Sequence, residues 1–154
     1  YGGETTVARL WRWVIDLETG IVTEEQLDDG ACDFPRINDS LIGLNSEFGY
    51  CMQLKTDVED LTFGEHLFKY HLESGKRTDH YLGKNVAGGE PVFAPKPGSS
   101  KEDEGWILSL VHERETRQSK LVIIDAEAFD HEPVAEVIIP QRVPYGAHGS
   151  WIQN

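Results

Sequence analysis

Short runs of apolar and β-branched residues, each ended by a polar or glycine-containing turn, recur along most of the chain. Residues 7–27 fit a hairpin, because an aromatic run at 10–15 leads into an acidic turn at 16–20 and then into a return strand. Further strand patterns cover residues 48–54 and 134–139. Long helical periodicity is nowhere evident. The pattern therefore predicts an all-β protein with antiparallel strands.

Three segments support more specific expectations. Residues 106–112 are apolar at nearly every position, which predicts a strand covered on both faces. Residues 96–105 have the composition of a solvated, mobile loop, and their acidic run at 102–104 is expected to face water. Pro35 should prevent residues 32–38 from forming a regular central strand, because proline has no backbone N–H to donate.

The first hairpin recurs along the chain. Residues 12–20 resemble residues 67–75, displaced by 55 positions, and more weakly residues 121–127, displaced by a further 54. Each copy is a strand that enters an acidic turn and leaves it, and we expect each to begin a new unit. Spacing near 50 residues with several strands per unit is typical of β-propeller blades, although an ordinary antiparallel sandwich is the alternative. Two to three blades cannot close a ring, so a propeller requires further chain.

Composition bounds the class of protein. The 154 residues, 39% hydrophobic and 27% charged, suffice for one globular domain. A net charge of −13 disfavours nucleic-acid binding, because no large basic patch offsets it. The N-terminus lacks a signal-peptide pattern and no apolar run is long enough to span a membrane, so a cytoplasmic location is expected. A start at Tyr1 without methionine fits a processed product or a piece of a longer protein.

The two cysteines, Cys32 and Cys51, lie in different segments without a CxxC spacing. We expect free, half-buried thiols in a reducing compartment, with a disulfide as the less favoured alternative.

Among the six histidines, none forms an H-x-H pair or an HExxH motif. His71 and His131 fit the surface, and His112 fits a hydrogen-bonded position at the end of a buried strand. Only His148 has glycines close on both sides, at Gly146 and Gly149, which permit positive φ and close approach of the backbone. A neutral imidazole is a frequent metal ligand, but one histidine does not make a metal site, and taken alone His148 fits a structural or surface role better than metal binding.

Two carboxylates stand apart from the charged runs. Glu90 precedes the apolar pair Val92-Phe93, and Asp33 precedes Phe34. A carboxylate that enters apolar surroundings needs a partner, and the N–H of a metal-binding imidazole is one such partner. A carboxylate that caps a turn is the alternative for each.

Three motifs in order give the chain a family resemblance from about Trp11 to its end. They are Asp33-Phe34-Pro35-Arg36-Ile37-Asn38, then Glu90-Pro91-Val92-Phe93 followed by Pro95, Pro97-Gly98 and Glu102-Asp103-Glu104-Gly105, and finally Val143-Pro144-Tyr145-Gly146-Ala147-His148-Gly149-Ser150-Trp151. Together they resemble the C-terminal third of the carotenoid cleavage oxygenase family. The resemblance implies a seven-bladed β-propeller, of which residues 1–154 would be the C-terminal two to three blades of a single domain.

The resemblance also implies a chemistry. Family members hold a non-haem Fe(II) through four histidines and use O2 to split a carbon–carbon double bond of a carotenoid, apocarotenoid or stilbene-like substrate into two carbonyl products. By position, His148 matches the last iron-binding histidine, and Glu90 matches a glutamate that hydrogen-bonds such a histidine. Asp33 falls where another such glutamate is usual, and Ala147 where an aromatic residue is common.

The remaining iron-binding histidines of the family would lie upstream. On this interpretation the 154-residue piece alone is inactive, and the longer protein acts on an apolar polyene or stilbene-like molecule with O2, with peripheral membrane contact left open. The alternative is a non-catalytic β-rich binding module that has lost its metal. As an isolated piece, the chain should also expose large apolar strand edges where the missing blades would pack, which would make it prone to aggregation or self-pairing.

Overall fold

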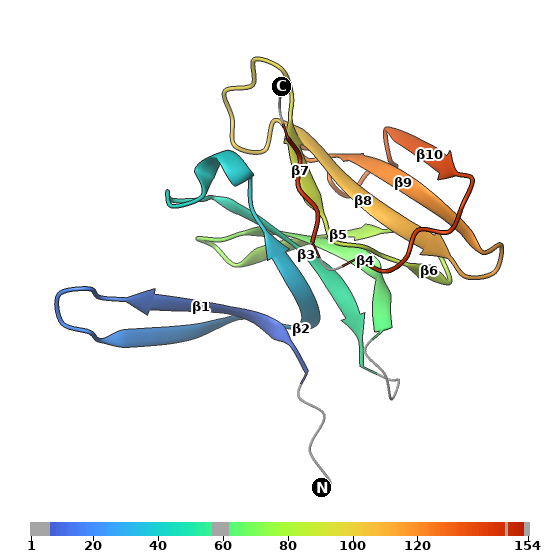
Figure 1. The fold of residues 1–154 in the computed structure, drawn as a ribbon. Coiled ribbons are helices and arrows are strands. Elements are labelled where there is room, and N and C mark those ends of the chain that lie inside the picture. Colours follow the sequence, from blue (N-terminus) through green and yellow to red (C-terminus); the bar gives the residue numbers. More distant parts are fainter. Residues whose placement is uncertain (1–6, 57–61, 147, 153–154) are drawn as a thin grey trace, which may run out of the picture.

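A computed structural model describes residues 7–56, 62–146 and 148–152. These residues form two five-stranded antiparallel sheets and a short 3-10 turn at Asp39–Leu41, with no α-helix among them (Figure 1). The all-β, antiparallel prediction is confirmed. The strands are β1 (Arg9–Ile15), β2 (Val22–Arg36), β3 (Phe48–Lys55), β4 (Thr62–His71), β5 (Lys76–Tyr81), β6 (Val86–Ala87), β7 (Val92–Pro95), β8 (Gly105–Glu113), β9 (Gln118–Asp125) and β10 (Ala135–Ile139).

The first sheet follows chain order from β1 to β5. Its long strand β2 pairs with β1 over its first part and with β3 near its end, where Cys32 lies opposite Gln53. The register shifts between Asp33 and Arg36, and Phe34 in between has a left-handed φ of 56°. Residues 32–36 are thus part of a central strand, but an irregular one, as Pro35 requires.

The segments that resemble one another in sequence form similar turns in the structure. Gly20 and Gly75 donate their N–H groups to the carbonyls of Asp16 and His71 at 2.8 and 2.9 Å, and both glycines have left-handed φ. In the third copy the Asp125 carboxylate accepts backbone N–H bonds, as the Asp16 carboxylate does. The first two copies lie in the same sheet, however, so the expectation that each copy begins a new unit is wrong for them.

The second sheet has the order β10-β9-β8-β6, and β7 also pairs with β8. Apolar side chains on one face of each sheet meet in a shared core, which consists of Tyr50, Met52, Leu54, Leu67, Val86, Phe93, Ile107, Val111, Val122, Ile124, Ala126 and Phe129. Strand β8 alternates between buried and more exposed residues, and Leu110 is 46% exposed. The prediction that this strand is covered on both faces is therefore wrong for the described residues.

The acidic loop before β8, in the second sheet, makes polar contacts with the first sheet. The Glu102 carboxylate accepts hydrogen bonds from the N–H groups of Glu47 and Phe48, and Asp103 pairs with Lys69 at 2.7 Å. The Asp103 side chain is only 16% exposed. The expectation of a fully solvated acidic run is wrong, because these carboxylates satisfy backbone donors and a buried lysine of the first sheet.

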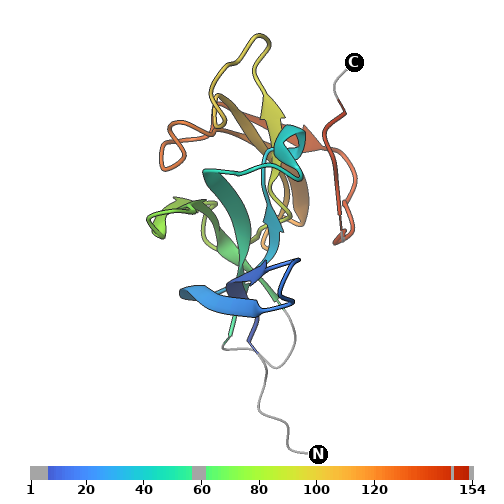
Figure 2. The same ribbon diagram turned by 90° about the vertical axis from the view of Figure 1, so that its left-hand side faces the viewer.

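Apolar side chains remain exposed at both ends of the molecule. The β1–β2 hairpin at the edge of the first sheet extends away from the rest of the molecule as an arm in Figure 1, and in Figure 2 its tip faces the viewer. Trp13 and Ile15 on this arm are exposed, as are Val137 and Ile138 on β10. Exposed apolar side chains therefore lie on the outermost strand of each sheet, and the expected self-pairing stays a prediction. Within the described residues, no helix is both long enough and apolar enough to cross a bilayer.

Cys32 and Cys51 are both free, which confirms that prediction. They are fully buried rather than half-buried, in a small cluster with Phe68 and Tyr70.

Candidate functional site

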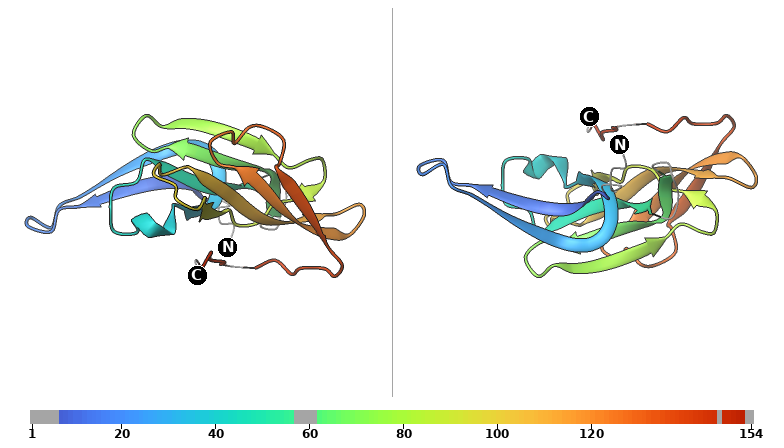
Figure 3. Two further views of the ribbon diagram at one scale, coloured as in Figure 1. Left: turned by 90° about the horizontal axis from the view of Figure 1, so that it is seen from above. Right: turned by 90° about the horizontal axis from the view of Figure 1, so that it is seen from below.

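The C-terminal segment, of which residues 140–146 and 148–152 are described, runs back along the second sheet after β10 (Figures 1 and 3). Val143 anchors its start by donating its N–H to the Ser119 hydroxyl at 2.9 Å. Neither Gly146 nor Gly149 has a left-handed φ, so the expected unusual backbone conformation at these glycines is not found. The predicted departure at Ala147 lies outside the described residues.

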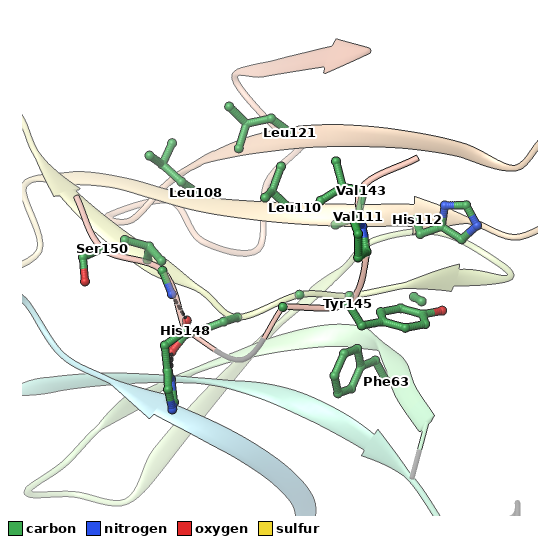
Figure 4. A pocket seen from close by; sticks show the side chains of 18 of the residues that line it. Phe63, Leu108, Leu110, Val111, His112, Leu121, Val143, Tyr145, His148 and Ser150 are labelled. Carbon is green, nitrogen blue, oxygen red and sulfur yellow. Dashed lines mark hydrogen bonds and ion pairs between the residues drawn. The ribbon is translucent and has the colours of Figure 1, made fainter. Parts of the chain in front are cut away.

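The end of this segment meets the carboxylate of Glu90. The Nδ1 atom of His148 lies 3.0 Å from Glu90 Oε1, and the N–H of Gly149 donates to Glu90 Oε2 at 2.6 Å (Figure 4). An ionised carboxylate can only accept, so Nδ1 must carry the proton of a neutral imidazole. Nε2 then keeps its lone pair, and it has no hydrogen-bond partner among the described residues.

Burial differs sharply between the two partners. The Glu90 side chain is 7% exposed, whereas that of His148 is 77% exposed. The imidazole is therefore held from one side by a buried anchor while the rest of the ring stays accessible. An accessible ring with a fixed Nδ1 can bind a further group through Nε2.

Gly89 makes the position of Glu90 possible. Its N–H donates to the Ser109 hydroxyl at 3.3 Å, which draws the chain onto β8. A Cβ atom at Gly89 would lie 2.2 Å from the carbonyl oxygen of Leu110, which no real side chain tolerates. Glycine is required here by close approach of two backbones rather than by its φ.

Arg36 completes the hydrogen bonding of Glu90. Its NH1 group donates to Glu90 Oε1 at 3.0 Å and to the carbonyl oxygen of Gly149, and its NH2 group contacts both carboxylate oxygens of Asp39. Burial disfavours the charged form of Glu90, but the hydrogen bonds from His148, Arg36 and Gly149 outweigh it and lower its pKa. Burial likewise opposes the charge on Arg36, but Glu90 and Asp39 together raise its pKa. Glu90 is thus held as a carboxylate.

One aromatic side chain contacts the imidazole, and two more extend from it. The Phe34 ring lies edge-on to the His148 ring with centroids 5.7 Å apart. Phe34 in turn contacts Phe63, and Phe63 contacts Tyr145 in the C-terminal segment. The left-handed conformation of Phe34 accompanies the irregular register of β2 that brings this ring to the site.

Asp33 lies apart from this arrangement. Its carboxylate accepts the N–H of the next residue, Phe34, at 2.7 Å. No contact between Asp33 and His148 is found in the described part of the chain. The prediction that Asp33 orients a metal-binding imidazole remains a prediction, since it concerns histidines outside this chain.

Sequence reasoning missed the residues that join these groups. A glutamate predicted to be buried requires a cation or several hydrogen-bond donors nearby. Arg36, in the first of the three motifs, was a cation that this requirement could have singled out. Phe34 and Phe63 gave no signal, because their proximity depends on the irregular end of β2. His80, buried and hydrogen-bonded to the carbonyl of Phe129 at 2.8 Å, was also missed as a core histidine.

A cavity of about 290 Å³ lies between the C-terminal segment and the second sheet. Apolar side chains of β8 and β9 line it, among them Leu108, Leu110 and Leu121, together with Tyr145. His148 lies at its edge, and in Figure 4 its ring points away from these leucines, toward the first sheet. The cavity and the accessible nitrogen of His148 therefore occupy different sides of the C-terminal segment.

The donor set fits one ligand of a metal site rather than a whole site. His148 offers a fixed, accessible imidazole nitrogen with a carboxylate behind its N–H, as metal-binding histidines usually have. Across residues 7–56, 62–146 and 148–152, no group of three or more histidine, cysteine or acidic side chains is arranged to hold a metal ion. Any metal bound through His148 needs further ligands from elsewhere.

Comparison with known proteins gives consistent matches over nearly the whole chain. A family model described as "Retinal pigment epithelial membrane protein" matches residues 2–153. The apocarotenoid-15,15'-oxygenase of Synechocystis sp. is 30% identical over 146 residues, which are 95% of this chain and 30% of that protein. The carotenoid cleavage oxygenase of Mycobacterium tuberculosis is 35% identical over 153 residues, which are 97% of this chain and 30% of that protein.

Solved structures agree with these matches. The cobalt-substituted Synechocystis apocarotenoid oxygenase is similar with a TM-score of 0.86 and 30% identity, over 95% of this chain and 30% of that one. The chain thus spans about 30% of the length of the relatives it matches. These matches confirm the prediction of a partial seven-bladed β-propeller rather than a self-contained sandwich.

Proposed function

Because this chain belongs to the retinal pigment epithelial membrane protein family, which includes the carotenoid cleavage oxygenases, we propose that it is the C-terminal part of a non-haem iron dioxygenase. The complete enzyme would split a carbon–carbon double bond of a carotenoid, apocarotenoid or stilbene-like substrate with O2 and release two carbonyl products. The 154 residues would form part of one propeller domain and would be inactive alone.

The hydrogen bond between Glu90 and His148 carries this proposal. It fixes the imidazole through Nδ1 and leaves Nε2 as the only ring nitrogen able to bind a metal. A surface histidine without such a role has no need of a buried carboxylate, because burying a charge is costly. Three hydrogen-bond donors around Glu90 offset the free-energy cost of burying its charge.

Three residues of the chain, His148, Glu90 and Asp33, each have a defined part in the proposed site. His148 would contribute one of several ligands to Fe(II), and Glu90 keeps the proton on Nδ1 and sets the orientation of the ring. When bound, Fe(II) would activate O2, while the substrate double bond itself would supply the electrons that reduce both oxygen atoms. Asp33 would orient a second imidazole, directly or through a water molecule because its side chain is short.

The partners of the whole protein belong to the same proposal. The apolar substrate and O2 follow from the names of the relatives, several of which cleave carotenoids or apocarotenoids. A stilbene-like substrate and peripheral contact with a membrane are further candidates for the complete protein. Iron is proposed over other divalent metals because the family resemblance implies it, and Fe(II) with open coordination positions is suited to reactions with O2.

The test compares two histidine variants of the longest form of the protein that carries this chain. His148→Ala should lose most of the bound iron, as measured by metal analysis, and all olefin cleavage. His131→Ala is the matched control, because that side chain is exposed and makes no side-chain contact to the site. If His148→Ala keeps full iron content and activity, the proposal is wrong. If neither variant nor the parent binds iron, the chain is instead part of a non-catalytic binding module.

A further inference from the structure

We propose that Arg36 is a positioning residue that holds both Glu90 and the backbone of the His148 loop in place for metal binding. The proposal rests on the function proposed above and deepens it. Arg36 does not face the accessible nitrogen of His148. It acts instead on the two groups that determine where that nitrogen points.

The geometry is a closed ring of hydrogen bonds around Gly149. The Gly149 N–H donates to Glu90 Oε2, and the Gly149 carbonyl accepts from Arg36 NH1. The same NH1 group donates its other hydrogen to Glu90 Oε1 at 3.0 Å, which closes the ring. Both backbone polar groups of the residue after His148 are therefore held by one carboxylate and one guanidinium.

A shared oxygen couples this ring directly to the imidazole. Glu90 Oε1 accepts from both Arg36 and His148, each at 3.0 Å. If Arg36 were absent, Glu90 would be held only by Gly149 and His148, so its carboxylate could turn together with the imidazole that it orients. The Gly149 carbonyl would also lose its partner, so the main chain beside His148 could shift.

Arg36 is itself fixed along its other edge. Its NH2 group contacts both Asp39 carboxylate oxygens at 3.1 and 3.0 Å, and its side chain is 15% exposed. A planar guanidinium can serve Asp39 through one nitrogen and Glu90 with Gly149 through the other, whereas a lysine ammonium offers one point of attachment. Arginine is thus suited to this position by its shape as well as its charge.

The experiment measures Co(II) binding to the metal-free form of the longer protein by its visible absorption spectrum. Cobalt is chosen because a similar solved structure contains it. Arg36→Met should weaken Co(II) binding by about 10-fold or more, as substitutions behind a metal-binding histidine do, and should shift the absorption bands. Arg36→Lys should recover part of the affinity, and Asp39→Asn should lose less than Arg36→Met.

Arg77→Met is the matched control. Arg77 is also a partly buried arginine of the first sheet with two carboxylate partners, Asp28 and Asp79, but it does not touch Glu90. Its replacement should leave Co(II) affinity and spectrum unchanged. If Arg77→Met weakens binding as much as Arg36→Met does, the effect is general destabilisation and the proposal is overturned.

A double variant separates positioning through Glu90 from any independent effect. In the Glu90→Gln background, Arg36→Met should cost much less additional affinity than in the parent, because the coupling atom is already altered. An equal loss in both backgrounds would overturn the proposal. If His148→Ala abolishes binding while Arg36→Met leaves affinity and spectrum unchanged, this inference fails and the proposed function stands. If His148→Ala leaves binding intact, both fail.

Discussion

The core between the two sheets and the corner around Glu90 are both largely buried, yet they are built in opposite ways. The core consists of apolar side chains from strands that are hydrogen-bonded neighbours, such as Met52 and Leu67. The corner joins Arg36, Glu90 and Gly149 from three separate segments through polar contacts. The core stabilises the sheets, whereas the corner orients one exposed imidazole. Stability and site geometry are therefore encoded in different residues, and each can be altered separately.

The largest effect on stability should come from the core alone. Ile107 is completely buried, so Ile107→Ala should lower the free energy of unfolding by about 2–5 kcal/mol, through lost burial and the cavity that remains. Urea denaturation followed by tryptophan fluorescence measures this. Ile138→Ala on the exposed strand β10 is the control and should change little. Similar losses for both variants would contradict a core centred between the two sheets.

Gly89→Ala should affect both regions, because Gly89 lies against β8 and directly precedes Glu90. The new Cβ would lie 2.2 Å from the Leu110 carbonyl, so the chain must move, at a cost of about 1–3 kcal/mol. Glu90 should move with it, which would weaken metal binding in the longer protein. Gly146→Ala serves as the control, since nothing lies within 4 Å of a Cβ there. Unchanged stability together with unchanged metal affinity would contradict this account.

The smallest expected effect is on the pH dependence of stability, through the buried imidazole of His80. Burial lowers the pKa of His80, although the bond to the Phe129 carbonyl opposes this. The unfolded chain then takes up a proton at higher pH than the folded chain. Stability contributed by neutral His80 is thus complete above about pH 6.5 and is lost as the pH falls below it.

Comparing urea midpoints near pH 7 and near pH 5 measures this loss, with pH values set around the ordinary histidine pKa. His80→Gln should show a smaller drop than the parent protein, and His131→Gln, at an exposed position, should match the parent. A drop of the same size in the parent and in His80→Gln would assign the acid sensitivity to carboxylates instead.

Much of the fold could be predicted from the sequence because it depends on local patterns. Alternating apolar residues indicated the strands, and the turn chemistry at Asp16–Gly20 indicated the repeated hairpin. Partners distant in sequence could not be predicted in the same way. The pairing of Asp103 with the donating ammonium of Lys69 and the exposure of Leu110 depend on how the sheets pack.

The residues of the candidate site likewise fall into those that local sequence could predict and those that depend on contacts between distant segments. His148 and Glu90 could be singled out from their neighbours and from the family resemblance, and the structure places them in contact. Arg36 could not be assigned to them, since its reach depends on the register shift near the end of β2. Asp33 was singled out on the same grounds as Glu90, but its carboxylate bonds only its neighbour's backbone in the described residues.

The contacts at the corner close very long loops. Arg36 and Glu90 are 54 positions apart, His148 and Glu90 are 58, and Arg36 and Gly149 are 113. Contacts this distant form slowly, because the entropy of closing the loop must be lost before they gain anything. The hairpins should therefore form early in folding and this corner last. Metal uptake through His148 would then report that the chain has finished folding.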